Sequence, residues 1–200
     1  MSGAPEIRVS RPELTMPKAE AALLREEYTR AEVILEYGSG GSTVVAAEMA
    51  GKTIFSVESD LEWTKMMRAW FAQNPPKSEV DVIWSDIGPT KEWGHPVNQA
   101  QWKRFAEYPL KVWELAEFRH PDVVLVDGRF RVGCVLATMY RIARPVVVLF
   151  DDYAERKQYH KIEEFAGTPK MAGRMARFEV APQAVPAERL LDIFRMMTQP

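Results

Sequence analysis

The sequence predicts a doubly wound α/β fold: a mostly parallel sheet with helices on both faces and a C-terminal antiparallel hairpin. Three observations lead to this prediction. Short apolar runs alternate along the chain with helix-forming segments, which is the element order of a parallel α/β sheet. Several runs are almost purely Val, Ile and Leu, as in strands that are buried on both faces. The 200 residues, 46% of them hydrophobic, are sufficient for one buried core.

The expected elements follow from apolar runs, helix formers and turn residues. The predicted strands are residues 32–37, 53–58, 79–85, 122–127 and 145–150. The predicted helices are residues 17–31, 43–50, 61–73, 110–118, 133–143 and 155–165. Residues 176–180 and about 189–196 are predicted to pair as the terminal hairpin, and residues 1–16 are predicted to be an extended or disordered lead-in. Residues 17–200 then form a single domain, with a long irregular insertion at about 86–109.

Composition argues against several classes of protein. The formal net charge of −2 lacks the basic excess of a general nucleic-acid binder. No apolar run is long enough to cross a bilayer, and the first thirty residues contain no apolar core of a signal peptide. The single cysteine, Cys134, excludes an intrachain disulfide and a cysteine-based zinc cluster. We therefore expect a cytoplasmic protein without membrane contact; nothing indicates its oligomeric state.

Right-handed crossovers place the loops that follow parallel strands at one edge of the sheet, where ligands bind in such folds. Every predicted strand ends there in an acid or a glycine turn. The first ends in Glu36-Tyr37-Gly38-Ser39-Gly40-Gly41-Ser42 and the second in Glu58-Ser59-Asp60. The third, fourth and fifth end in Ser85-Asp86-Ile87-Gly88, Asp127-Gly128-Arg129-Phe130-Arg131 and Asp151-Asp152-Tyr153.

The glycine turn and Glu58 together predict a nucleoside-type ligand. Glycine lets the backbone approach a ligand, and the following helix N-terminus offers free N–H groups. Glu58 lies twenty residues after Gly38, which suits an acid that binds ribose hydroxyls. No Lys-Ser or Lys-Thr follows Gly41, which argues against a Walker loop, and Thr43 stands where a dinucleotide fingerprint has glycine. An NAD-dependent enzyme remains an alternative.

Glu36-Tyr37-Gly38-Ser39-Gly40 matches an acid-x-Gly-x-Gly signature. With it, the chain from Glu32 onward resembles the class I S-adenosylmethionine-dependent methyltransferases. The resemblance implies S-adenosylmethionine as the cofactor and a set of residues that would bind it: Glu36, Gly38, Ser39, Gly40, Ser42, Glu58, Ser59, Asp86, Ile87 and Asp127.

The resemblance also implies a role for each part of this set. The loop from Gly38 to Ser42 would meet the methionine portion of the cofactor, and Glu58 would hold the ribose. Asp86 and Ile87 would flank the adenine, and Asp127 would lie below the sulfonium. Because methyl transfer is an in-line displacement, positioning would contribute much of the rate acceleration.

Asp127, Asp151 and Asp152 also resemble the acids that hold a divalent metal in some O-methyltransferases of this fold. Several carboxylate oxygens would suit Mg²⁺. The alternative is that Asp151 or Asp152 only caps the next helix. An acceptor oxygen or nitrogen would need a base or a metal, and the candidate catalytic residues are Asp127, Asp152 and His160.

Arg129 and Arg131 could clamp a substrate carboxylate, sugar acid or phosphate. Equally, they could form ion pairs with Asp127 and Asp152 that only shape the loop. The candidate substrate-binding residues are Arg129, Arg131, Trp93, His95 and Tyr153. The sequence thus predicts a methyltransferase that acts on a small-molecule or carbohydrate-like acceptor, with O-methylation as the expected reaction. The alternatives are a methyltransferase-like cofactor-binding protein without transfer activity and the NAD-dependent enzyme.

Overall fold

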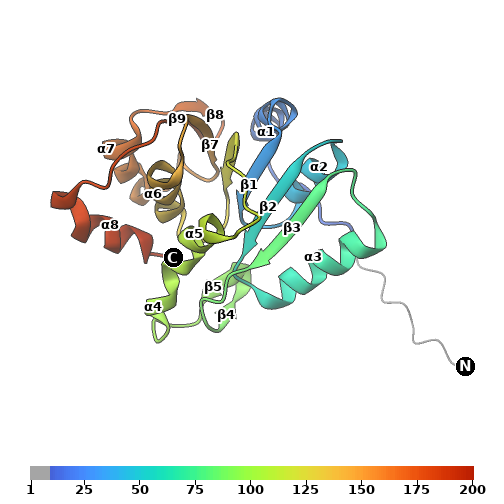
Figure 1. Ribbon diagram of the computed structural model, residues 1–200, viewed down its shortest axis with the longest axis horizontal. Helices are drawn as coiled ribbons and strands as arrows, with labels where there is room; N and C mark the ends of the chain where they lie inside the picture. The colour runs from blue at the N-terminus through green and yellow to red at the C-terminus, as the bar shows by residue number, and fades with distance from the viewer. Residues whose placement is uncertain (1–9) are drawn as a thin grey trace, which may run out of the picture.

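The computed structural model describes residues 10–200, which fold around a seven-stranded mixed sheet (Figure 1). The strand order is β3-β2-β1-β6-β7-β9-β8. The strands are β1 (Val33–Tyr37), β2 (Thr53–Glu58), β3 (Glu79–Trp84), β6 (Val123–Val126), β7 (Val146–Phe150), β8 (Lys170–Ala172) and β9 (Met175–Val180). The first five are parallel, whereas β9 runs antiparallel to β7 and β8 antiparallel to β9. The prediction of a doubly wound sheet with a C-terminal antiparallel pair is confirmed.

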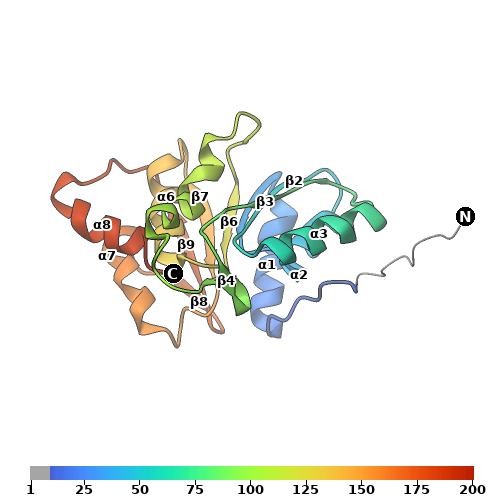
Figure 2. The same ribbon diagram turned by 90° about the horizontal axis from the view of Figure 1, so that it is seen from below.

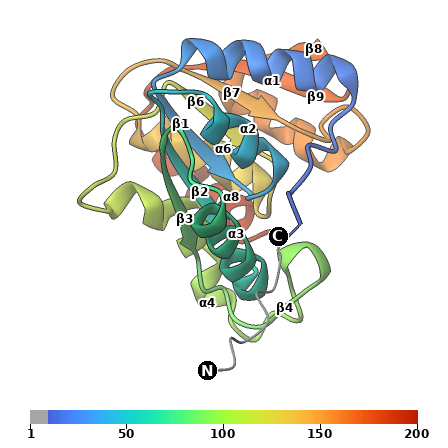
Figure 3. The same cartoon turned by 90° about the vertical axis from the view of Figure 1, so that its right-hand side faces the viewer.

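Helices cover both faces of the sheet, as Figures 2 and 3 show. One face carries α1 (Lys18–Arg30), α2 (Gly41–Glu48) and α3 (Leu61–Gln73). The other carries α5 (Glu107–Leu110), α6 (Arg131–Arg141) and α8 (Leu190–Met197). Because side chains alternate along a strand, the central strands β1, β2, β6 and β7 contribute to both cores: Leu35 packs with the α6 side and Ile34 with the α1 side. This two-sided burial is why the strands are almost uninterrupted apolar runs.

The strand order reverses between β1 and β6, which creates the switch point of the sheet. The chain leaves β1 toward β2 and β3 on one side and returns through β6 and β7 on the other. The loops that follow β1 and β6 are therefore neighbours at the carboxyl edge, where the candidate site residues were expected.

The terminal hairpin is formed by other segments than those predicted. Its strands are β8 and β9, whereas residues 190–197 form helix α8 after a short 3-10 helix, η4 (Ala187–Arg189). The apolar residues Leu190, Ile193, Phe194 and Met197 follow the i, i+3, i+4, i+7 pattern of a helix. A strand would need alternation, so the assignment of 189–196 as a strand is wrong.

Two predicted helices are shorter than expected, and the insertion is more ordered. Residues 110–118 contain only the end of α5 and the 3-10 helix η2 (Lys111–Glu114). Residues 155–165 form the 3-10 helix η3 (Lys157–Ile162) and then α7 (Glu163–Ala166). Within residues 86–109 lie the elements β4 (Thr90–Lys91), η1 (Glu92–Gly94), β5 (His95–Pro96) and α4 (Trp102–Phe105).

The predicted lead-in, residues 1–16, falls partly outside the described residues, because these begin at residue 10. Residues 10–16 form no helix or strand, but Leu14 and Met16 pack against the α1 and α2 core, and Arg11 pairs with Glu48. Among the described residues, no helix combines the length and apolarity needed to span a membrane.

Candidate active site at the carboxyl edge of the sheet

The glycine loop between β1 and α2 touches the loop that follows β6. Gly38 has a positive φ of 108°, and a Cβ added to it would lie 2.8 Å from the backbone nitrogen of Gly128. Gly128 in turn leaves no room for a Cβ beside the hydroxyl of Tyr108. Both glycines are therefore required by close packing, which brings the two loops together at the switch point.

Glu36 lies behind the glycine loop rather than at the open edge. Its fully buried carboxylate accepts hydrogen bonds from the Tyr28 hydroxyl (2.6 Å), the Thr43 hydroxyl (2.5 Å) and the Ser56 hydroxyl (3.1 Å). Burial raises the pKa of Glu36, and the hydroxyl donors oppose that shift. The Thr43 hydroxyl also accepts the Gly40 N–H at 3.0 Å. Glu36 thus holds the loop indirectly; direct cofactor contact would require it to lose these partners.

Glu58 joins the ends of β1 and β2. One carboxylate oxygen accepts the backbone N–H groups of Ser59 (2.7 Å) and Asp60 (2.9 Å), and the other accepts the N–H of Ser39 (3.2 Å). The side chain is 8% exposed, and its burial raises the pKa of the carboxyl while these N–H donors oppose the shift. The Ser39 hydroxyl meets that of Ser56 at 2.7 Å. The glycine loop and Glu58 therefore form one connected structure.

A cleft of about 330 Å³ opens next to Glu58, between β3 and the start of α3. Its lining residues are Ser59, Leu61, Trp84, Asp86, Gly88, Pro89, Thr90, Gln101 and Arg104. Asp86 accepts the Gly88 N–H (2.9 Å) and pairs with Arg104 (2.6 Å). Ile87 is 1% exposed and packs in the core. Asp86 and Ser59 thus face the cleft, whereas Ile87 does not line it. Ser42, at the start of α2, is also buried.

The β4–β5 hairpin covers Glu58. The Ser59 hydroxyl donates to the Gly94 carbonyl at 2.9 Å, and a Cβ on Gly94 would lie 3.1 Å from a carboxylate oxygen of Glu58. Trp93 has a φ of 62° and is 87% exposed. His95 is half-buried, with Nδ1 3.1 Å from the Pro96 carbonyl. The two predicted substrate-binding residues of the insertion, Trp93 and His95, therefore belong to this cover.

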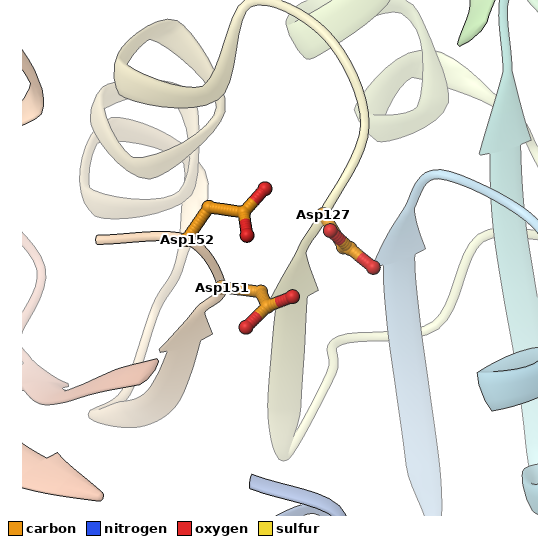
Figure 4. Close-up of side chains that lie close together, drawn as sticks. All are labelled: Asp127, Asp151 and Asp152. Atoms are coloured by element: carbon orange, nitrogen blue, oxygen red, sulfur yellow. The ribbon is translucent and has the colours of Figure 1, made fainter. Parts of the chain in front are cut away.

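Three aspartates meet at the ends of β6 and β7 (Figure 4). Asp127 follows β6, and Asp151 and Asp152 follow β7. One carboxylate oxygen from each lies within 4.8 Å of the other two. Burial raises the pKa of Asp127 to about 7; the guanidinium of Arg131 opposes this shift, whereas the other two carboxylates add to it.

Three arginines occupy this cluster. Arg131 Nη2 lies 3.2 Å from carboxylate oxygens of both Asp127 and Asp152. Arg174 pairs with Asp151 at 2.7 Å and with Asp152 at 3.2 Å, and Arg156 pairs with Asp152 at 2.8 Å. The ion pairs of Arg131 with Asp127 and Asp152 are those that were predicted from the sequence as the alternative to substrate binding.

The cluster in this arrangement does not fit Mg²⁺. Clustered carboxylate oxygens are the ligands that Mg²⁺ prefers, but guanidinium groups already bind all three carboxylates. Arg131 is 4% exposed and is fixed by the carbonyls of Gly128 (3.0 Å) and Asp151 (2.6 Å). A dication would have to bind beside this buried positive charge, which Coulomb repulsion disfavours.

His160 and Tyr153 bind each other next to the cluster. His160 Nε2 lies 3.1 Å from the Tyr153 carbonyl, and the two rings stack at 4.7 Å. The Tyr153 hydroxyl donates to Glu163 at 2.7 Å, and the side chain is buried. Burial, followed by the hydrogen bond to Glu163, raises the pKa of Tyr153. The predicted catalytic role of His160 and substrate contact of Tyr153 remain predictions, and both would require these contacts to change.

Arg129 differs from Arg131 although only Phe130 separates them. Its side chain is half-buried, and its Nε is buried without a hydrogen-bond partner among residues 10–200. Burial lowers the pKa of Arg129, and the positive charge of Arg131 lowers it further. Sequence reasoning missed two residues here: Arg174, which reaches the cluster from the β8–β9 turn, and Tyr108, whose hydroxyl lies 3.3 Å from the Val57 carbonyl. Neither follows a predicted parallel strand, so no local signal marked them.

Comparison with known structures finds a strong match. A methyltransferase-like protein from Silicibacter pomeroyi DSS-3 shares 61% sequence identity, with a TM-score of 0.92 over 95% of this chain and 99% of that chain. The O-methyltransferase TomG from Streptomyces achromogenes, in complex with S-adenosylmethionine, shares 13% identity (TM-score 0.58; 85% and 82% coverage). The O-methyltransferase from Bacillus cereus, in complex with S-adenosylhomocysteine, shares 12% (TM-score 0.56; 86% and 84%). Neither a family model nor a curated protein matches the chain.

The sheet order, the acid-x-Gly-x-Gly loop after β1 and the acid at the end of β2 define a class I methyltransferase fold. The two O-methyltransferases support this fold assignment. The chain belongs to the family of the methyltransferase-like protein from S. pomeroyi, and its fold is that of the class I methyltransferases. The family resemblance predicted from the sequence is confirmed.

Proposed function

We propose that the protein transfers the methyl group of S-adenosylmethionine to an oxygen atom of a small-molecule or carbohydrate-like acceptor. The observation that carries this proposal is the 3.2 Å hydrogen bond between Glu58 and the Ser39 N–H, next to a cleft lined by Ser59 and Asp86. A glycine loop, a ribose-type acid and an adjacent cleft are the elements that an adenosyl ligand needs. The O-methyltransferases TomG and that of B. cereus, which share this fold, supply the precedent for O-methylation.

The cofactor would bind across the switch point. The glycine loop would receive its methionine portion, and the Glu58 carboxylate would exchange backbone N–H donors for ribose hydroxyls. Asp86, at the cleft, would accept from the adenine amine. The sulfonium would then lie near the Asp127 side of the loops.

Asp127 is the best-placed candidate base of this arrangement. Bound S-adenosylmethionine would supply an electrophilic methyl group, and an acceptor hydroxyl would have to lose its proton as its oxygen attacks. Asp127 would take that proton, because a carboxyl with a pKa of about 7 matches a neutral operating pH. The products are the methyl ether or ester and S-adenosylhomocysteine. No step is assigned to Mg²⁺, since the arginines already bind the three carboxylates.

Ligand titration tests the cofactor. Calorimetry or thermal shift with S-adenosylhomocysteine, NAD and ATP compares the competing nucleotide classes, because a ligand that binds only the native state raises the melting temperature. We expect binding of S-adenosylhomocysteine alone. Preferential binding of NAD would replace this proposal with the alternative of an NAD-dependent enzyme.

An acceptor screen tests the transfer. Methyl-labelled S-adenosylmethionine is incubated with panels of hydroxylated small molecules and sugars, with Mg²⁺ and with a chelator. We expect label in an ether or ester product, and equal rates under both conditions. Cofactor binding with no labelled product from any panel would favour the binding protein without transfer activity. Loss of label on chelation would overturn the metal-free assignment.

A further inference from the structure

Among the residues that the structure describes, Arg129 is a cation without an acidic partner in a region where neighbouring arginines are paired. Arg131 contacts two carboxylates and three backbone carbonyls. Arg156 and Arg174 each bind at least one carboxylate. In the part of the chain that the structure describes, the Arg129 guanidinium contacts no carboxylate, and its buried Nε has no acceptor. A buried donor without an acceptor is destabilising because its lost hydration is not replaced. An anionic ligand that accepted this hydrogen bond would remove that desolvation penalty.

The backbone that carries Arg129 is fixed from both sides. Its N–H points to the Tyr108 hydroxyl at 3.5 Å, and its carbonyl accepts the Cys134 thiol at 3.4 Å. The next residue, Phe130, has a φ of 51° and is fully buried between Phe105 and Tyr108, with ring centroids 5.2 and 5.5 Å away. A left-handed non-glycine residue persists only where its surroundings hold it. The missing partner of Arg129 is therefore not explained by a loose loop.

Arg129 lies in the loop that joins the two parts of the proposed site. It follows Gly128, which packs against Gly38 of the glycine loop, and precedes Arg131, which joins Asp127 to Asp152. A group bound by Arg129 would thus lie between the methionine end of the expected cofactor and the acid cluster. A planar guanidinium matches a carboxylate with two parallel hydrogen bonds. Asp127, two residues before Arg129 in the same loop, would oppose a phosphate dianion more strongly than a carboxylate monoanion.

We propose that Arg129 is the anchor of a carboxylate-binding site, and that the orphaned Nε and one terminal nitrogen of its guanidinium hold the bound group. This inference rests on the proposed function, because it adds a charged recognition element to the same edge. The carboxylate has two possible sources: the amino-acid portion of the cofactor, or an acidic acceptor such as a carboxylated phenol or a sugar acid. The chemistry of recognition is the same for both.

Two adenosyl ligands separate these sources. S-adenosylhomocysteine carries the carboxylate, whereas 5′-methylthioadenosine lacks the entire amino-acid portion. Both are titrated calorimetrically into the wild type, Arg129→Gln and the control Arg144→Gln. Arg144 lies just before β7, and its exposed guanidinium pairs with Asp122 in the wild type. If the cofactor is the source, Arg129→Gln lowers the affinity for S-adenosylhomocysteine by about tenfold to a hundredfold, as expected for a lost charge-assisted pair. Binding of 5′-methylthioadenosine stays unchanged.

Benzoate serves as the acceptor-side probe. The arginine Nε–Hε signals of ¹⁵N-labelled protein are followed by NMR as benzoate is added, with and without saturating 5′-methylthioadenosine, and the Arg129 signal is assigned from its loss in Arg129→Gln. If the acceptor is the source, benzoate shifts this signal and both adenosyl affinities survive the substitution. The proposal is overturned if benzoate leaves the signal in place and Arg129→Gln binds both adenosyl ligands like the wild type. Failure of the wild type to bind either adenosyl ligand would instead refute the proposed function, and the benzoate titration would still decide on Arg129.

Discussion

The two halves of the carboxyl edge hold their acids in different ways. On the β1–β2 side, Glu58 accepts three backbone N–H groups, which are neutral donors. On the β6–β7 side, Asp151 and Asp152 are bound by guanidinium groups, which carry permanent charge. Neutral donors can be exchanged for ligand hydroxyls at little cost, whereas separating buried charges is expensive. We therefore assign ligand recognition to the first half and loop rigidity to the second, with the candidate base Asp127 and Arg129 as the exceptions.

The largest effect is expected on the charged side. Arg131→Met leaves Asp127 and Asp152 without their shared buried partner, so we expect a loss of about 3–5 kcal/mol in the free energy of unfolding. Urea denaturation measures it. Arg144→Met, which removes an exposed ion pair with Asp122, should cost less than about 1 kcal/mol. Equal losses in the two variants would contradict the claim that the buried ion pairs of this half contribute more stability than an exposed pair does.

The contact between the halves is tested next, at Gly38. Gly38→Ala places a Cβ 2.8 Å from Gly128 at a φ of 108°, and we expect a loss of about 2–3 kcal/mol together with weaker S-adenosylhomocysteine binding. Gly40→Ala is the matched control, since its φ is 171° and no heavy atom lies within 4 Å of its added Cβ. Chemical denaturation of both variants measures the difference. A Gly38→Ala protein as stable as Gly40→Ala would show that the loops can separate freely.

The pKa of Asp127 gives a pH-dependent test of the charged half. Its folded pKa of about 7 lies above the ordinary 3.8, so between these values the native state keeps a proton that the unfolded chain has lost. This group therefore makes the protein less stable as pH rises from about 4 to 7. In Asp127→Asn, the free energy of unfolding should therefore fall by roughly 1–2 kcal/mol less over this pH range. The full pKa shift would predict more, but solvent screens a side chain that is one-third exposed. Denaturation curves across this range that fall equally in both proteins would contradict the assignment.

The smallest effect is expected at the hairpin that covers the recognition half. Ser59→Ala removes the hydrogen bond to the Gly94 carbonyl, which should cost about 1 kcal/mol. Hydrogen exchange at residues 90–96 should become faster, whereas exchange in β6 and β7 should not change. Unchanged exchange in the hairpin would mean that other contacts hold it over Glu58.

The sequence was sufficient for what depends on local pattern. The apolar runs located β1, β2, β6 and β7 within a few residues, because a strand buried on both faces is recognisable by itself. The edge strand β3 was also located, although most of its residues are only partly buried. The acids and glycines at their ends then followed, since parallel strands present their carboxyl ends at one edge. Glu58 and the Asp127 cluster were predicted in this way.

What the sequence did not reveal depends on contacts between distant segments. Arg174 reaches Asp151 only because β9 pairs with β7 and the β8–β9 turn returns to the carboxyl edge, and the hairpin was predicted from the wrong segments. The hydroxyl partners of Glu36 were not predicted either, because strand alternation directs its side chain, like that of Ile34, toward Tyr28 of α1. The different fates of Arg129 and Arg131 also depend on three-dimensional neighbours, because the two share almost the same local sequence.

Glu58→Ala is the most direct test of whether the β1–β2 half binds an adenosyl group. S-adenosylhomocysteine is titrated calorimetrically into the wild type, into Glu58→Ala and into Glu48→Ala, whose exposed carboxylate pairs with Arg11 away from the cleft. We predict binding to the wild type and to Glu48→Ala with equal affinity, and at least about tenfold weaker binding to a folded Glu58→Ala protein. Equal affinity of Glu58→Ala and the wild type would contradict the assignment of this edge as the cofactor site.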